Sequence, residues 1–227
     1  MPGQESVASA DRERYVAAYA TNVARLHAAW DDFASSHRRF ALDLDHLIDA
    51  PAAALVPFLR DRPDDLAYLR ALTAFLRRSV EEWGDALSWG VCHGDLHGGN
   101  AHLGADGSVT LFDFDCGGMG YRAYELAVFR WGTAAAWGKD ADRFWAQFVK
   151  SYGAEHPLAQ ADLDAVPVFV AIRQLWWMGL QAANADDWGS RRWLGERSMD
   201  LYLMRAAHWC ALNVPGAPAW ECRWSLS

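Results

Sequence analysis

The sequence predicts a mainly α-helical chain with one small β-hairpin near its centre, an α+β architecture. On both sides of the centre, apolar residues recur every three to four positions, which is the spacing of one helix face. Between these stretches, two short apolar runs flank the segment 104–108, whose glycines, aspartate and serine are typical of a tight turn. With 227 residues, 52% of them hydrophobic, the chain can bury a sizeable core.

On the N-terminal side of the hairpin, we expect helices after a frayed or disordered segment, residues 1–11. The acidic residues around Pro63 favour a helix start, because carboxylates stabilise helix N-termini. The predicted helical stretches in this part are 15–33, 44–49, 52–60 and 66–83. A short apolar run, 89–92, precedes the hairpin.

The hairpin is predicted from the apolar runs 101–103 and 109–114. After Gly120 the helical periodicity returns, and the predicted helices there are 121–137, 140–152, 162–183 and 190–212. Since there is no internal repeat and no low-complexity linker, we expect one domain over residues 12–212 and an irregular tail over 213–227.

Composition argues against several classes of protein. The net charge of −8 disfavours nucleic-acid binding, which requires basic residues to neutralise phosphates. No apolar run reaches the roughly 18–20 residues that span a bilayer, and the N-terminus lacks the apolar core of a signal peptide. We therefore expect a cytoplasmic protein that binds no membrane. The four cysteines have no zinc-ligand spacing, which favours reduced thiols.

The centre of the chain concentrates polar side chains in a pattern suited to metal binding. It reads H-G-D-L-H-G-G-N over residues 93–100, and L-F-D-F-D over residues 111–115. Antiparallel pairing would bring Asn100 and Asp113 to the same open end of the hairpin. An amide oxygen and a carboxylate side by side are hard ligands that suit Mg²⁺.

Asp95 lies five residues before Asn100, in a glycine-rich loop that can turn sharply beside a ligand. One carboxylate could then face a substrate hydroxyl while Asn100 and Asp113 hold the metal. Phosphoryl transfer needs these two separate roles, because the metal neutralises the charge of the phosphates and the base orients the attacking hydroxyl.

These motifs resemble those of a known family. H-x-D-x-x-x-x-N followed by an apolar strand that ends in Asp matches the catalytic and metal loops of kinases. The glycine between His93 and Asp95, and the sequence G-G-M-G-Y-R-A-Y-E-L-A over residues 117–127, are similar to the aminoglycoside phosphotransferase/choline kinase family. The resemblance covers roughly residues 12–212 and implies a protein-kinase-like C-terminal lobe.

The resemblance implies a role for each matching residue. Asp95 would be the catalytic base, and Asn100 and Asp113 the Mg²⁺ ligands. His93 would support the loop structurally. Glu125, which stands where the family usually has Asp, would tie its helix to the catalytic loop.

The same resemblance implies ATP and Mg²⁺ as cofactors, and a small-molecule hydroxyl as the acceptor. It assigns no nucleotide-binding residues in this chain, and no firm role to His97 or Asp115.

A complete kinase of this type also has an N-terminal β lobe with a phosphate-covering loop and a phosphate-binding lysine. The 92 residues before His93 are predicted to be helical, and they contain no lysine and no G-x-G-x-x-G motif. The two lysines of the chain, Lys139 and Lys150, follow the metal loop, so neither has the position of the phosphate-binding lysine. We therefore expect this lobe to be absent and turnover to be impaired. A truncated product, a lobe supplied in trans by a partner, and a weakly catalytic relative all fit, and an uncovered junction would favour self-association.

Tryptophans offer a clue to the acceptor, since the chain has 13 of them. Four occur near acidic residues in the second half of the chain: Trp176, Trp177, Trp188 and Trp193, with Asp186, Asp187 and Glu196. Aromatic faces with carboxylates suit a cationic amine. Core packing is the competing interpretation, because Trp176 is in register with Ile172 and Leu180.

Two alternatives to a kinase remain open. The first is a non-catalytic binding or regulatory module with the same fold. The second is a metallohydrolase, because His93, Asp95, His97 and His102 superficially resemble a metal cluster, although no downstream cluster completes it. Asp106 is interpreted as a turn residue, and His102 as a surface or packing residue.

Overall fold

The computed structural model describes residues 9–33, 39–104, 106–189 and 194–221. The chain divides into two compact units, which the sequence analysis treated as one domain. Unit 1 comprises Met1–Phe40 and Ser88–Leu163, and unit 2 comprises Ala41–Leu87 and Asp164–Ser227. Helix α6 begins with the last residues of unit 1 and continues into unit 2.

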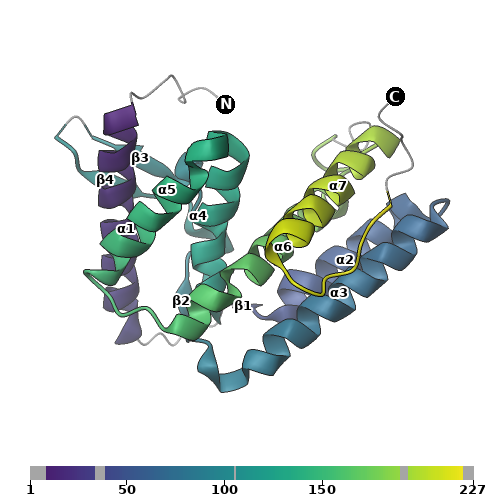
Figure 1. The fold of residues 1–227 in the computed structure, drawn as a ribbon, viewed down its shortest axis with the longest axis horizontal. Coiled ribbons are helices and arrows are strands. Elements are labelled where there is room, and N and C mark those ends of the chain that lie inside the picture. Colours follow the sequence, from purple (N-terminus) through teal and green to yellow (C-terminus); the bar gives the residue numbers. More distant parts are fainter. Residues whose placement is uncertain (1–8, 34–38, 105, 190–193, 222–227) are drawn as a thin grey trace. The chain divides into compact units, whose positions relative to one another are not determined.

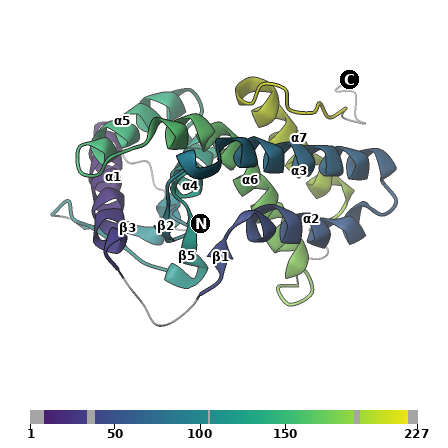
Figure 2. The ribbon, with the colours of Figure 1, turned by 90° about the horizontal axis from the view of Figure 1, so that it is seen from below.

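Unit 1 combines three helices with short strands among its described residues (Figure 1). Its elements are α1 (Ser9–Asp31), β2 (Trp89–Cys92), β3 (Ala101–Leu103), β4 (Val109–Leu111), β5 (Gly118–Tyr121), α4 (Arg122–Trp137) and α5 (Ala141–Gly153). Strands β2 and β5 pair antiparallel, and so do β3 and β4. The β3–β4 hairpin lies beside α1 (Figures 1 and 2).

Unit 2 is almost entirely helical. Its elements are β1 (Ala41–Leu42), α2 (Ala50–Leu55), α3 (Pro63–Trp83), α6 (Gln160–Ala183) and α7 (Glu196–Asn213), with short helical turns at Asp45–Asp49 and Val56–Leu59 on either side of α2. Figure 2 shows α2 crossing α6. The backbones approach closely there, because a Cβ on Gly179 would lie 2.3 Å from Cα of Pro51.

The predicted hairpin and long helices are confirmed, with shifted ends. Helix α7 begins at Glu196, and residues 190–193 of the helix expected there lie outside the described residues. The expected irregular segment 1–11 overlaps the start of α1 at Ser9, and residues 1–8 lie outside the described residues. Asn213, where the expected tail begins, is still helical, and the chain has no helix or strand from Val214 to residue 221, where the description ends.

Strand β5 was not predicted, because its G-M-G-Y sequence lacks the alternation typical of strands. Glycine is required there by a close approach of two backbone segments. A Cβ on Gly118 would lie 2.3 Å from the carbonyl oxygen of Phe40. The glycine that this packing requires is a residue that strands disfavour, so the sequence of β5 does not predict a strand.

The core of unit 1 is built from the stripe predicted on α1. Tyr19 and Val23 are buried on this stripe, and α1 packs against α5. The Phe129 ring stacks on Tyr19 and on Phe148, with centroid distances of 5.5 and 4.3 Å. Burying each such side chain contributes about 1.5–3 kcal/mol, so this cluster fixes α1 beside the segments that carry the catalytic motifs.

A buried charge cluster holds α3 to α7 within unit 2. Arg62, immediately before α3, donates from Nε to Asp65 at 2.6 Å and from its terminal nitrogens to Asp200 and to the Glu196 carbonyl. Trp220 donates to the other carboxylate oxygen of Asp65 at 2.8 Å. Each charge thus has partners, which offsets the cost of burying it.

We expect Arg62→Ala to lower the free energy of unfolding by about 3–5 kcal/mol, because it leaves Asp65 and Asp200 without their cation in a buried site. Urea unfolding followed by circular dichroism measures this. Arg78→Ala, at an exposed position of α3, is the matched control and should change the value by less than about 0.5 kcal/mol. Equal effects of the two substitutions would refute the role given to the cluster.

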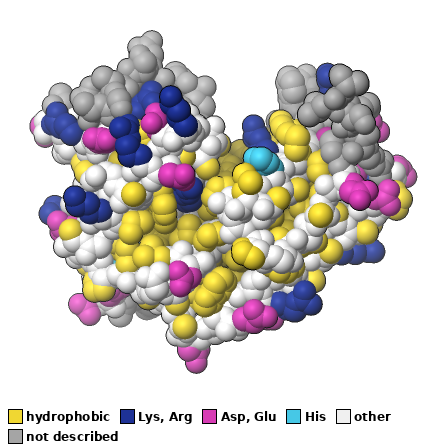
Figure 3. Space-filling view, viewed as in Figure 1, with side chains coloured by type: hydrophobic (Ala, Val, Ile, Leu, Met, Phe, Trp, Pro, Cys, Tyr) yellow, Lys and Arg dark blue, Asp and Glu magenta, His cyan; other side chains and the backbone are white. Residues whose placement is uncertain are grey.

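Among the described residues, no helix is both long enough and apolar enough to cross a bilayer. On the face shown in Figure 3, the described Lys and Arg side chains are interspersed with Asp and Glu rather than joined in a basic stripe.

Candidate functional site

The loop between β2 and β3 carries the H-G-D-L-H-G-G-N motif, and the side chain of His93 links it to β4. His93 is fully buried, and its Nε2 lies 3.0 Å from the carbonyl oxygen of Phe112. The Asp95 N–H donates to Nδ1 of the same ring at 3.4 Å. These contacts place the proton of a neutral ring on Nε2, which donates to the carbonyl. His93 thus joins the two segments that hold Asp95 and Asp113.

Glu125, in the first turn of α4, holds the start of the loop from the other side. Its buried carboxylate accepts hydrogen bonds from the backbone N–H of His93 and, at 3.2 Å, from that of Gly94. Burial by itself would raise the pKa of Glu125. The nearby His27 and His93 side chains and the His93 N–H outweigh it and hold the pKa below its ordinary value. Glu125 therefore meets the start of the loop as an ionised, hydrogen-bonded carboxylate, and the role that the family resemblance implies for it stays a prediction.

Asp95 and Asn100 are joined directly. Asn100 is buried, and its Nδ2 donates to the Asp95 carbonyl at 2.8 Å and to the Asp95 carboxylate at 3.2 Å. The amide nitrogen is thereby committed to Asp95, which leaves the amide oxygen as the atom available to a cation. About 18% of the Asp95 side chain is exposed, so solvent can reach it.

The hairpin register brings Asp113 to the same end of the hairpin as Asn100. Ala101 pairs with Leu111, and the Phe112 N–H donates to the Asn100 carbonyl at 3.1 Å. Asp113 follows directly, with an exposed side chain and a left-handed backbone at φ 67°. It is the sole non-glycine residue with positive φ in the described part of the chain. Such strain costs about 1–3 kcal/mol and is concentrated at functional sites.

His97, which received no role from the sequence, also lies beside Asp95. The Gly99 N–H donates to its Nδ1 at 2.9 Å, so the ring proton is on Nε2, 3.6 Å from the Asp95 carboxylate. Asp115 has an exposed side chain, and its backbone carbonyl accepts a hydrogen bond from Arg39 at 2.6 Å.

Two supporting residues on α1 were missed by the sequence analysis. The Tyr19 hydroxyl donates to the Leu96 carbonyl at 2.6 Å and so anchors the middle of the loop. His27 is buried behind Glu125. Their positions in the sequence could have indicated this role, because both residues carry polar atoms on or next to the apolar face of α1. A polar atom buried there needs a hydrogen-bond partner.

Asp106 and His102, the two other polar residues of the hairpin considered in the sequence, are exposed. Asp106 accepts from the N–H and the hydroxyl of Ser108, which confirms it as a turn residue, and His102 is exposed. Within the described ranges, no three His, Cys, Asp or Glu side chains are grouped so that they could hold a metal. The His-rich metal cluster considered for a metallohydrolase is therefore not formed by these residues.

The tryptophans considered for a cationic amine differ in their surroundings, as far as the described residues show. Trp176 is buried, donates to His46 at 3.3 Å and lies under the Arg173 guanidinium, so the core interpretation is confirmed for it. Trp188 is 54% exposed, and Trp193 lies outside the described residues.

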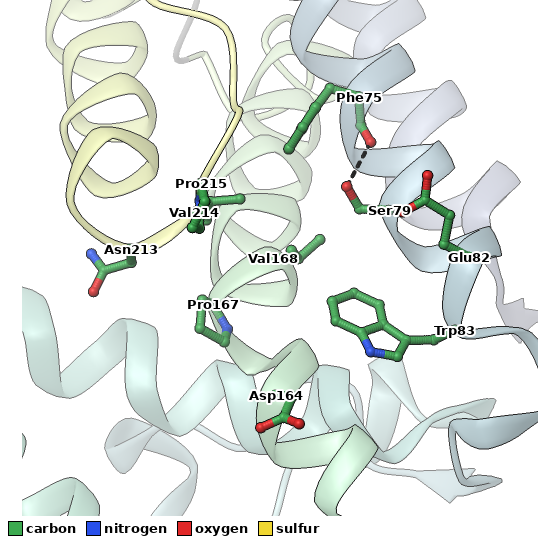
Figure 4. Close-up of a pocket in the computed structure, with 10 residues that line it drawn as sticks. All are labelled: Phe75, Ser79, Glu82, Trp83, Asp164, Pro167, Val168, Asn213, Val214 and Pro215. Carbon is green, nitrogen blue, oxygen red and sulfur yellow. Dashed lines mark hydrogen bonds between the residues drawn. The ribbon is translucent and has the colours of Figure 1, made fainter.

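Unit 2 contains a separate open pocket of about 380 Å³, shown in Figure 4. Its lining comes from the second half of α3, the first half of α6, and the end of α7 with the two residues after it: Phe75, Ser79, Glu82, Trp83, Asp164, Pro167, Val168, Asn213, Val214 and Pro215. None of the residues of the 93–100 and 111–115 motifs lines it, so it is a different feature from the Asp95 site.

Comparison with known proteins supports a kinase fold. The model of the family described as "Phosphotransferase enzyme family" matches residues 1–162. An uncharacterised protein from Deinococcus radiodurans is 40% identical over 195 residues, which cover 85% of this chain and 56% of that protein. A homoserine kinase from Bradyrhizobium is 30% identical over 183 residues, which cover 74% of this chain and 53% of that protein.

Among solved structures, an amicoumacin kinase in complex with AMP-PNP and Ca²⁺ superposes with a TM-score of 0.64 at 19% identity, covering 97% of this chain and 65% of that one. This likeness confirms the predicted fold class. The chain spans about half the length of the two curated relatives. Because the family model matches residues 1–162, which is most of the sequence, the chain belongs to the phosphotransferase enzyme family.

Proposed function

We propose that this chain carries the catalytic and metal-binding part of an ATP- and Mg²⁺-dependent kinase that phosphorylates a hydroxyl group of a small molecule. The observation that supports this most strongly is the arrangement of three side chains. Asn100 is hydrogen-bonded to the Asp95 carboxylate, and the hairpin register brings Asp113 to the same end of the hairpin. Phosphoryl transfer requires a base and a metal site next to each other.

Asn100 and Asp113 would hold the cation. An amide oxygen and an exposed carboxylate form the type of hard donor set that Mg²⁺ takes, with water and phosphate oxygens completing its shell. When bound, Mg²⁺ neutralises charge on the nucleotide phosphates. The hydrogen bond from Asn100 to Asp95 keeps the base at a fixed distance from this position.

Asp95 would accept the proton of the acceptor hydroxyl. Its partly exposed carboxylate can receive a hydrogen bond from an alcohol, which orients the oxygen for in-line attack on the γ-phosphate. Nε2 of His97 lies 3.6 Å from the same carboxylate, so this ring borders the position that the acceptor hydroxyl would take.

The relatives support a small hydroxylated acceptor with an amino group. The homoserine kinase is named for an amino acid with a side-chain hydroxyl, and the amicoumacin kinase was solved with a nucleotide analogue and a divalent cation. We extend this class, a hydroxylated amine, to the present chain.

The test is phosphorylation by the purified chain, followed by ³¹P NMR, with MgATP and a panel of homoserine, amino alcohols and aminoglycosides. We expect a new phosphate-ester resonance that requires Mg²⁺ and disappears with EDTA. A folded chain that neither binds MgATP nor phosphorylates any acceptor would contradict the proposal. MgATP binding without transfer would instead favour a binding or regulatory module.

A further inference from the structure

A buried pair of side chains behind Glu125 has no part in the chemistry above. His27, on α1, and Tyr152, on α5, are both completely enclosed. Nδ1 of His27 lies 2.6 Å from the Tyr152 hydroxyl oxygen, although the residues are 125 positions apart in the sequence. Nε2 of His27 lies 3.7 Å from the Glu125 carboxylate, the same group that holds the catalytic loop.

The protonation states of the pair follow from burial. Burial raises the pKa of Tyr152 well above its ordinary value, so its hydroxyl is protonated at neutral pH and donates to His27. Burial is also the largest influence on His27 and lowers its pKa, outweighing the attraction of Glu125. A neutral His27 carries one proton, and since Nδ1 accepts from Tyr152, that proton lies on Nε2.

Glu125 therefore faces three N–H groups: the backbone amides of His93 and Gly94 and the ring Nε2–H of His27. The first two belong to the loop that carries Asp95. His27 occupies the remaining side of the carboxylate, where its buried Nε2 lies 3.7 Å from a Glu125 oxygen and makes no hydrogen bond within the described part of the chain. A Glu125 that rotated away from the loop would lose this N–H as well.

The other charged groups around His27 are themselves fixed. Arg122, on α4, donates to Asp31 at 2.8 Å, and Asp31 also accepts from Nε2 of His156 at 2.7 Å. The His156 ring packs edge-on against His27 and Tyr152. These contacts enclose the pair and keep the Arg122 cation paired with Asp31.

We propose that His27 and Tyr152 are positioning residues for the catalytic loop. The Tyr152 hydroxyl fixes the tautomer of His27, so that Nε2–H always faces Glu125 and keeps its carboxylate aligned with the amides of His93 and Gly94. The proposal deepens the proposed function and rests on it for any effect on catalysis, but the arrangement itself can be measured without turnover.

The test uses ¹⁵N NMR of the full chain with labelled histidine, together with amide hydrogen exchange. In the wild type, His27 should show a protonated Nε2 and an unprotonated Nδ1 at pH 7. In Tyr152→Phe, which keeps the ring and removes the donor, the proton should redistribute between the two nitrogens. The Gly94 amide should then exchange roughly three- to tenfold faster, the factor expected for weakening one hydrogen bond.

Two further variants separate positioning from general destabilisation. Tyr68→Phe, in unit 2, removes a buried tyrosine hydroxyl that has no hydrogen-bond partner among the described residues and should change neither signal. His27→Gln keeps a neutral N–H donor and should preserve the slow exchange of Gly94, whereas His27→Leu should lose it. In active protein, Tyr152→Phe and His27→Leu should lower kcat while the KM for MgATP changes less than twofold.

An unchanged tautomer and unchanged Gly94 exchange in Tyr152→Phe would overturn the proposal, and so would equal exchange rates in His27→Gln and His27→Leu. A chain without any phosphotransferase activity would refute the proposed function and leave the NMR results to decide the positioning role.

Discussion

Asp95→Asn is expected to lower kcat for phosphate transfer by about 10²–10⁴-fold, the usual contribution of a general base. The substitution keeps the shape of the side chain, and the Asp95 backbone carbonyl still accepts from Asn100. It removes the charge that would take the hydroxyl proton. Because the proposed ligands Asn100 and Asp113 are unchanged, MgATP binding should persist, and the loss should appear in kcat. Single-turnover measurements with saturating MgATP, alongside calorimetric MgATP titration, resolve the two effects.

The matched control for Asp95→Asn is Asp106→Asn, at the exposed turn of the hairpin. An asparagine can still accept the hydrogen bonds from Ser108, so neither stability nor kcat should change appreciably. If Asp95→Asn retained more than about a tenth of wild-type kcat, Asp95 would not be the base.

Glu125→Leu is expected to reduce the free energy of unfolding by about 3–5 kcal/mol, because removing one partner from a buried charged network leaves the others unpaired. Here the groups left without an acceptor are the buried N–H groups of His93 and Gly94. Urea unfolding at pH 7 measures the loss. Glu82→Leu, which removes an exposed glutamate on α3, should cost less than about 0.5 kcal/mol.

The effect of Glu125 should also depend on pH in a defined direction. The pKa of Glu125 is held below its ordinary value of 4.5 in the folded protein, so the unfolded chain binds more protons as the solution is acidified. Its contribution is therefore complete above about pH 5 and is lost as the pH falls through the folded-state pKa. The stability difference between wild type and Glu125→Leu should shrink below about pH 4. A constant difference between pH 3 and pH 7 would show that Glu125 is not ionised in the folded protein.

The sequence predicted the catalytic motifs and their local geometry because these depend on nearby residues. The turn at 104–108 determines the pairing of Ala101 with Leu111, and the pairing places Asn100 and Asp113 at one end of the hairpin. Helix ends were also predicted to within a few residues wherever the apolar stripe was continuous, as in Arg122–Trp137.

Contacts between distant segments could not be read in this way. His27 lies four positions after Val23 on α1, so its periodicity is that of an ordinary core residue, and only the fold brings it to Tyr152 and Glu125. Strand β5 was hidden for a related reason, since Gly118 is required by the approach of Phe40. The division into two compact units likewise has no local signal in the sequence, because α6 continues from one unit into the other without a linker.

The measurement that tests the central claim most directly is paramagnetic broadening by Mn²⁺, a substitute for Mg²⁺, in ¹H–¹⁵N spectra of the chain with ATP. We predict that the amide signals of Asp95, Asn100 and Asp113 weaken first, and that Asp113→Ala removes this selective loss. Selective broadening elsewhere, for example at Glu82 and Asp164 in the pocket of unit 2, with the signals near Asp95 unaffected, would contradict a metal site at the open end of the hairpin.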